Sequence, residues 1–164
     1  DQGQLRLEAQ FITPPGAYQA QAALLLADGL TSGSARQAVE VLPDEAFRIS
    51  TPILTDQFDG RTPVARAGRT FRADGSLHCL VEVLGSQIVG PVLAGVQLLG
   101  NDGRVWRDVR PDPITSARRS RMWSLPLSDL PPGPYSLSIS VLDEGTRQGL
   151  QQREPFEIVA PAGS

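Results

Sequence analysis

A proline-glycine corner followed by a strictly alternating segment constrains this chain more than any other feature. The corner is Pro-Pro-Gly-Pro at positions 131–134, and apolar side chains then alternate with serines from Tyr135 to Val141. A period of two over this length predicts a strand with one buried face. Proline fixes φ and donates no backbone hydrogen bond, so the corner itself is a turn. We therefore expect Tyr135 to enter a strand with its ring inward and its hydroxyl turned back to the corner, as in the tyrosine corner of immunoglobulin-like sandwiches.

The same corner occurs a second time near the start of the sequence. Pro-Pro-Gly-Ala at 14–17 precedes Tyr18, which lies 117 positions before Tyr135, and segment 35–41 matches segment 152–158 at the same offset. Both copies place a corner, an alternating strand, a turn and a second strand in the same order. The repeat predicts two hairpins of one design.

The first copy of the repeat is incomplete. Residues 4–11 also alternate and predict a strand ahead of the corner, so residues 1–42 are expected to be the three closing strands of a sandwich whose earlier strands are missing. Three strands with one apolar face rarely stand alone in water. That face needs cover from the second unit, from another chain or from polypeptide outside this sequence.

The pattern of the remaining sequence predicts one full sandwich. Residues 43–46 form a short polar linker, residues 47–159 carry seven or eight segments with strand patterns, and residues 160–164 form a small tail. No stretch shows sustained helical periodicity. The predicted fold is all-β, with an immunoglobulin- or fibronectin-III-like antiparallel sandwich preceded by a partial, three-strand sandwich-like segment.

Turn residues divide the second unit further. Gly-Asn-Asp-Gly at 100–103 lies between two apolar runs and predicts a hairpin. After it, residues 105–109 predict a strand and residues 111–117 a loop. Pro155 restricts the last strand to a sheet edge or a bulge, because proline cannot donate to a ladder.

Composition excludes several classes of function. The chain has 164 residues and a net charge of −3, so its overall charge does not attract it to nucleic acid or to anionic membranes. Cys79 is its one cysteine, which excludes an internal disulfide, and its strand-like surroundings predict a small buried side chain. The apolar runs are too short to span a bilayer. Peripheral contact with a membrane stays open.

The sequence does not assemble a known catalytic or metal-binding motif. A serine hydrolase needs a nucleophile, a base and an orienting acid, and His78 is the one histidine, on a predicted strand, where we interpret it as structural. Four aspartates precede glycine, a pattern typical of turns first and of calcium sites second: Asp28, Asp59, Asp74 and Asp102. We therefore expect no enzymatic activity, no cofactor and no metal.

Two groups of side chains are candidate contacts. Arg118, Arg119 and Arg121 form the densest basic cluster, which we interpret either as a solvated strand start or as a contact for an acidic partner or a lipid headgroup. Trp106 and Trp123 would form a platform for a sugar if both were exposed. The alternative for the tryptophans is that at least one of them packs in the core.

Three segments resemble a known bacterial group. Residues 47–56 (FRISTPILTD), 69–85 and 127–156 together resemble the C-terminal region of large extracytoplasmic proteins with von Willebrand factor A-related domains, common in acidobacteria and their relatives. Residues 1–42 resemble the end of the preceding sandwich repeat in such chains. The A-type domain of that family binds metal through Asp-x-Ser-x-Ser, which is absent here. The resemblance implies a location in the periplasm or cell envelope and a role as an interaction module.

These features predict a non-enzymatic structural or protein-interaction subunit of the bacterial envelope. It would dock to a larger protein assembly through the incomplete N-terminal segment and through open sheet edges. Strand addition is a natural mode of docking, because an open edge offers unpaired backbone groups. The alternative is a carbohydrate-binding module that uses an exposed tryptophan.

Overall fold

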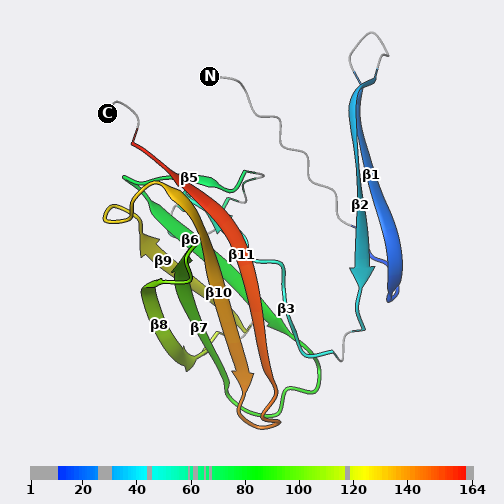
Figure 1. Cartoon of the computed structure of the whole chain (residues 1–164). Helices are drawn as coiled ribbons and strands as arrows, with labels where there is room; N and C mark the ends of the chain where they lie inside the picture. Colours follow the sequence, from blue (N-terminus) through cyan, green and yellow to red (C-terminus); the bar gives the residue numbers. More distant parts are fainter. Residues whose placement is uncertain are drawn as a thin grey trace. The chain divides into compact units, whose positions relative to one another are not determined.

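A computed structural model describes residues 11–25, 31–43, 46–58, 60, 63–64, 66, 68–116 and 119–161 (Figure 1). The regular structure of these residues consists of eleven strands, β1 to β11, and contains no helix. The predicted all-β, sandwich-like fold class is confirmed. The chain divides into two compact units, Asp1–Asp44 and Glu45–Ser164.

The described part of the first unit is one antiparallel hairpin. β1 (Gly16–Leu25) pairs with β2 (Thr31–Val41), and the register shifts once, between Leu24 and Leu25. The strand predicted over residues 4–11 lies outside the described residues except for Phe11, which is exposed and outside any strand.

Two sheets build the second unit. One has the strand order β5-β11-β10-β7-β8, and in the other β6 pairs with β3, β4 and β9. All pairs are antiparallel except β5 with β11. In Figure 1, β10 and β11 run in front of β6 and β9, so the two sheets form two layers. The strands of the first sheet are β5 (Thr70–Arg72), β7 (Val92–Gly100), β8 (Val105–Pro113), β10 (Gly133–Asp143) and β11 (Gly149–Val159). Those of the second are β3 (Arg48–Ile49), β4 (Ile53–Thr55), β6 (Ser76–Leu84) and β9 (Ser120–Pro126).

The hydrophobic core lies between these two layers. Alternate residues of β6 are buried along its whole length, because successive side chains of a strand point to opposite faces. Cys79 on β6 is buried and free of any disulfide, as expected. Burial raises the pKa of its thiol to about 12. The core combines these side chains with those of β10 into one cluster: Leu77, Cys79, Val81, Val83, Tyr135, Leu137, Ile139 and Val141.

The end of β8 differs from the sequence prediction. Residues 111–113 continue the strand, where a loop was expected. β8 is an edge strand, so prolines at 111 and 113 leave only a solvent-side hydrogen bond unmade, which an edge tolerates. Pro155 follows the same rule, because it lies on β11 outside the three residues that pair with β5.

The two proline-glycine hairpins have the same backbone design. β10 pairs with β11 from Gly133↔Ile158 to Val141↔Leu150, and β1 pairs with β2 at every corresponding position, 117 residues earlier. Gly16 and Gly133 have φ of 155° and 150°, a region that favours glycine. The predicted correspondence of the two hairpins is therefore confirmed at the level of register.

The tyrosine corners repeat in the same way. The hydroxyl of Tyr18 donates to the carbonyl oxygen of Pro14 at 2.8 Å, and that of Tyr135 donates to the carbonyl oxygen of Pro131 at 2.8 Å. Both bonds close the corner over four residues, as the sequence predicted. Burial, with a smaller contribution from the charge of Asp102, raises the pKa of Tyr135 above its ordinary value.

Candidate functional site

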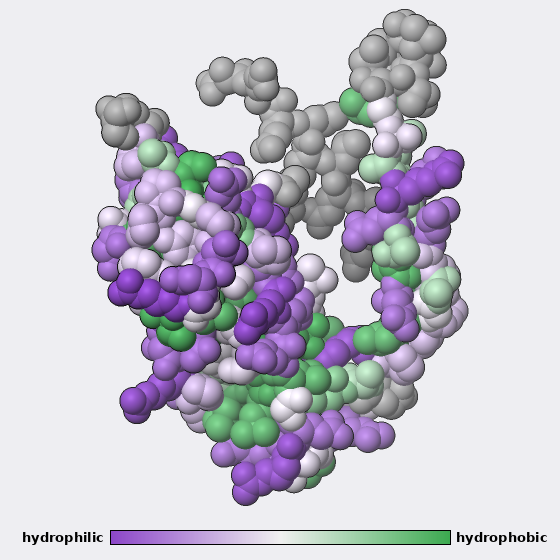
Figure 2. Space-filling view, viewed as in Figure 1, coloured by the Kyte–Doolittle hydropathy of each residue, from purple (hydrophilic) through white to green (hydrophobic). Residues whose placement is uncertain are grey.

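The candidate site is one face of the β1–β2 hairpin. Register and alternation place seven apolar or small side chains on this side together with Gln37 and Gly33. We call the seven side chains the hairpin face: Tyr18, Ala20, Ala22, Leu24, Ala35, Val39 and Val41. The opposite side is more polar: it carries Gln19, Gln21, Ser34, Arg36 and Glu40 beside the alanines at 17, 23 and 38. Figure 2 shows green, hydrophobic residues among the purple and pale residues of the hairpin.

The large side chains of the hairpin face are exposed. Tyr18 is 38%, Leu24 42% and Val39 40% exposed. Their counterparts in the second unit are Tyr135, Val141 and Phe156, which are 7%, 3% and 5% exposed. The same positions of the same hairpin design are core residues in one unit and surface residues in the other.

The edges of the first hairpin are also open. Among the described residues, β1 pairs with β2 alone and β2 with β1 alone. In the second unit, β7 and β5 occupy the corresponding edges of β10 and β11. An unpaired edge presents a row of N–H and C=O groups to which another strand can be added. Within the described residues, the hairpin therefore combines an apolar face with two strand edges that no other strand pairs.

The described arginines of the predicted basic cluster make intramolecular contacts. Arg121 forms an ion pair with Asp112 at 3.1 Å between Nη2 and Oδ2. Nη1 of Arg119 donates to the carbonyl oxygen of Gly85 at 3.2 Å. Arg118 lies outside the described residues. The two described arginines therefore contact different intramolecular partners.

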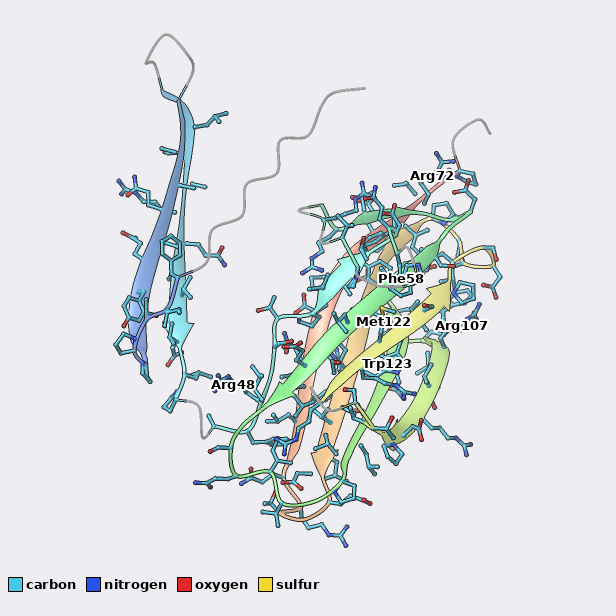
Figure 3. All side chains as sticks on the ribbon, turned by 180° about the vertical axis from the view of Figure 1, so that it is seen from behind. Arg48, Phe58, Arg72, Arg107, Met122 and Trp123 are labelled. Carbon is cyan, nitrogen blue, oxygen red and sulfur yellow. The ribbon has the colours of Figure 1, made fainter. Side chains whose placement is uncertain are left out.

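The two tryptophans do not form an exposed pair. Trp123, on β9 (Figure 3), is 5% exposed and belongs to the core, so it offers no ring face to a sugar. Trp106 is partly buried, packs edge-on against Tyr135 at 6.4 Å between ring centroids and lies beneath the guanidinium of Arg104. At least one tryptophan packs in the core, as the strand positions favoured, so the condition for a platform of Trp106 and Trp123, that both rings are exposed, is not met.

His78 has a partner that the sequence did not reveal. The β6–β9 register sets it opposite Ser124, and Nδ1 lies 2.8 Å from the serine Oγ. The ring also packs against Phe58, at 5.3 Å between centroids. In a catalytic triad, Nδ1 faces the acid and Nε2 faces the serine. The pair therefore has the form of a cross-strand hydrogen bond.

The aspartates that precede glycine act in turns where they are described. Asp74 forms an ion pair with Arg72 at 2.8 Å, and that hydrogen-bonded contact lowers the pKa of the carboxyl. Oδ1 of Asp102 accepts from the backbone N–H of Arg104 at 2.9 Å. Asp28 and Asp59 lie outside the described residues. Across the part of the chain that the structure covers, no three His, Cys, Asp or Glu side chains are grouped to hold a metal ion.

A buried carboxylate organises the turn between β10 and β11. Asp143 is 1% exposed and accepts hydrogen bonds from the Thr146 hydroxyl and from the N–H groups of Gly145 and Val89. Burial on its own raises the pKa of Asp143, but these hydrogen bonds outweigh it and hold the pKa below its ordinary value. The sequence identified the turn but not the burial of its acid.

In the described part of the chain, these observations define an all-β protein with a sandwich-like unit and a separate hairpin that pairs with no further described strand. No long apolar helix suited to crossing a bilayer occurs among the described residues. No protein-family model and no curated protein matches the chain. Among solved structures, the soluble domain of PmoD from Methylocystis sp. is similar, with a TM-score of 0.45 and 9% identity, covering 68% of this chain and 90% of that chain. A likeness at that level assigns no function.

Proposed function

We propose that this chain is a non-enzymatic protein-interaction module that docks to a larger protein assembly through its N-terminal hairpin. One observation carries the proposal. The β1–β2 hairpin has the register and the corner hydrogen bond of a sandwich hairpin, but its apolar face is exposed. Its twin in the same chain shows that this design belongs inside a sandwich.

Covering the hairpin face is energetically favourable. Complete burial of a valine, leucine or aromatic side chain contributes roughly 1.5–3 kcal/mol relative to full exposure. Tyr18, Leu24 and Val39 are about 40% exposed, so covering what remains adds roughly 1 kcal/mol for each side chain. Backbone pairing at an open edge adds affinity and fixes orientation. A partner that supplies both a strand and an apolar layer would bind through backbone pairing and through burial of apolar surface.

The proposal also includes a location in the bacterial periplasm or cell envelope. It rests on the resemblance of residues 47–56, 69–85 and 127–156 to extracytoplasmic proteins with von Willebrand factor A-related domains. Cell fractionation of the source organism with an antibody to this chain tests it. Recovery in the cytosolic fraction alone would contradict the location and leave the docking proposal untouched.

Affinity capture with matched variants tests the docking. The immobilised chain is exposed to an envelope extract of the source organism, and retained proteins are identified by mass spectrometry and reconstituted with the chain as purified components. Val39→Asp places a charge on the hairpin face and is expected to abolish the reconstituted complex. Ala38→Asp places the same charge one residue earlier, on the opposite side, and is the control expected to retain it.

Two results would contradict the proposed function. One is a complex that both aspartate variants retain, because the hairpin face would then play no part. The other is a hydrolytic activity of the purified chain that His78→Ala or Ser124→Ala removes, because the chain would then be an enzyme.

A further inference from the structure

We propose that the outer edge of β1 receives an antiparallel strand of a partner protein, in the register that β7 uses on β10, with bulky apolar side chains opposite Ala20 and Ala22. This inference rests on the proposed docking function. It adds the edge that is used, the register of the pairing and the chemistry of the partner strand.

The second unit indicates which edge of the hairpin is the docking edge. β10 pairs with β7 along Tyr135–Asp143, whereas β11 pairs with β5 only along Glu157–Val159. Because the two hairpins share one register, β1 corresponds to β10 and offers the long antiparallel edge. A longer ladder supplies more backbone hydrogen bonds, so the edge of β1 dominates the interaction.

The side chains of β1 specify the partner. Ala20 and Ala22 occupy the positions of Leu137 and Ile139, which are fully buried in the second unit. Protein interiors pack without voids, so smaller side chains on one element call for larger side chains on its neighbour. The partner strand therefore carries leucine, isoleucine, valine or aromatic side chains at the two positions opposite these alanines.

The β1 strand of a second copy of the chain does not meet this requirement. In a two-fold antiparallel pairing of β1 with itself, the register that places Tyr18 opposite Ala20 places Ala22 opposite Gly16. Placing Tyr18 opposite Ala22 sets the two copies of Ala20 against each other. Placing Tyr18 opposite Leu24 sets the two alanines against each other. Within β1 (Gly16–Leu25), every two-fold register that keeps the apolar residues on one face sets at least one alanine opposite alanine or glycine, or opposite no residue of β1. The complementary strand is therefore not a second β1, and we assign it to a different protein.

The β7 sequence itself is a suitable probe. In the proposed register, Leu98 of a β7 copy lies opposite Ala20 and Val96 lies opposite Ala22. A fluorescein-labelled peptide copying residues 90–103 is titrated with the full chain and followed by fluorescence anisotropy. We expect saturable binding that weakens by about tenfold or more when both residues of the peptide are changed to alanine, since about 1.4 kcal/mol corresponds to a tenfold change.

Disulfide formation between introduced cysteines tests the register directly. By correspondence with Ser138↔Gln97, residue Gln21 of the chain lies opposite Gln97 of the peptide. The Gln21→Cys chain is therefore expected to form a disulfide with a Gln97→Cys peptide, because directly opposed residues come within disulfide distance. Peptides with Gly95→Cys or Leu99→Cys place the thiol two residues away and are expected to react poorly. Cys79 is buried and stays unreactive in these experiments.

The outcomes separate this inference from the proposed function. Equal crosslinking of all three cysteine peptides, equal binding of the alanine peptide, or a disulfide-linked homodimer of the Gln21→Cys chain that excludes the peptide would overturn the inference. So would a failure of the β7 copy to bind while a natural partner still distinguishes Val39→Asp from Ala38→Asp, and that result would leave the docking function standing. Peptide binding that survives Ala22→Asp, a charge placed opposite Val96 of the peptide, would assign the peptide to another part of the chain and overturn the inference as well.

Discussion

The hairpins β1–β2 and β10–β11 begin with the same corner, pair in the same register and carry the same hydrogen bond from a tyrosine to a carbonyl oxygen four residues earlier. Their surroundings differ. β10–β11 has strands on both outer edges and a second sheet across its apolar face, whereas the described residues provide β1–β2 with no further strand on either edge.

This difference shows which properties of a hairpin are local. The corner, the pairing and the choice of face depend on residues within the hairpin, so they are identical in both copies. Burial depends on segments that are distant in sequence, so it differs. Among the described residues, the difference also marks the first hairpin as a part whose apolar side chains are exposed.

The largest contrast is expected at the paired positions 39 and 156. Phe156→Ala removes a core ring and should lower the free energy of unfolding of the second unit by about 3–5 kcal/mol. Val39→Ala should change it by less than about 0.5 kcal/mol, because Val39 is on the surface of the other unit. Urea denaturation followed by tryptophan fluorescence measures both, since Trp106 and Trp123 lie in the second unit.

The Val39→Ala result can contradict the difference in burial between the two hairpins. A loss above about 1 kcal/mol would show that the hairpin face packs on the second unit in the isolated chain. The face would then not be free for a partner.

The corner hydrogen bond should matter more in the second unit than in the first. Tyr135→Phe removes a partly buried bond and is expected to cost about 0.5–1.5 kcal/mol. Tyr18→Phe removes an exposed bond of the same length, and water replaces it at little cost, so a change below about 0.5 kcal/mol is expected. Thermal unfolding of each variant, followed by far-UV circular dichroism, gives the two values, and equal losses would mean that Tyr18 is covered.

Acid should affect the turn of the second hairpin. The pKa of Asp143 is lowered on folding, so its contribution to stability is present above the ordinary aspartate pKa and is lost as the pH falls through the folded value. We expect the urea midpoint of the second unit to fall below about pH 4, and the fall to be smaller in Asp143→Asn. The first hairpin has Leu26 at the corresponding position and lacks this acid. An unchanged acid profile in Asp143→Asn would assign the effect to other carboxylates.

Thiol reactivity is expected to differ between the two regions with the smallest effect on the stability of the fold. Cys79 is buried and its pKa is about 12, so it should react with a disulfide reagent only when the second unit unfolds. A cysteine introduced by Val39→Cys should react at once in native buffer. Reaction of the two thiols at one rate in native buffer would show that the two regions are protected equally.

The strand pattern and the hairpin pairing could be predicted because each rests on neighbouring residues. The alternation from Tyr135 to Val141 placed these side chains in the core, and the repeat at Tyr18 gave the correct register for β1–β2. β8 was predicted too short, because a proline signals the end of a strand in the middle of a sheet but is tolerated at an edge. Only the sheet order shows that β8 is an edge.

The site could be predicted only in part. An uncovered apolar face followed from the missing strands of the first copy, and the interaction of that face with a protein stays a proposal. The partners of Arg119, Arg121 and His78 could not be predicted, because each lies on another segment brought near by cross-strand register or a loop. The burial of Trp123 also depends on packing between sheets, which no local pattern encodes.

The sequence by itself determined where the chain turns, which residues alternate and which side of each strand is apolar, because proline and glycine restrict φ locally and strand geometry repeats every two residues. Only the tertiary structure decided which apolar faces are buried, since burial requires distant segments to meet. That is why two hairpins of one design lie in this chain, one in the core of a sandwich and one with its apolar face exposed.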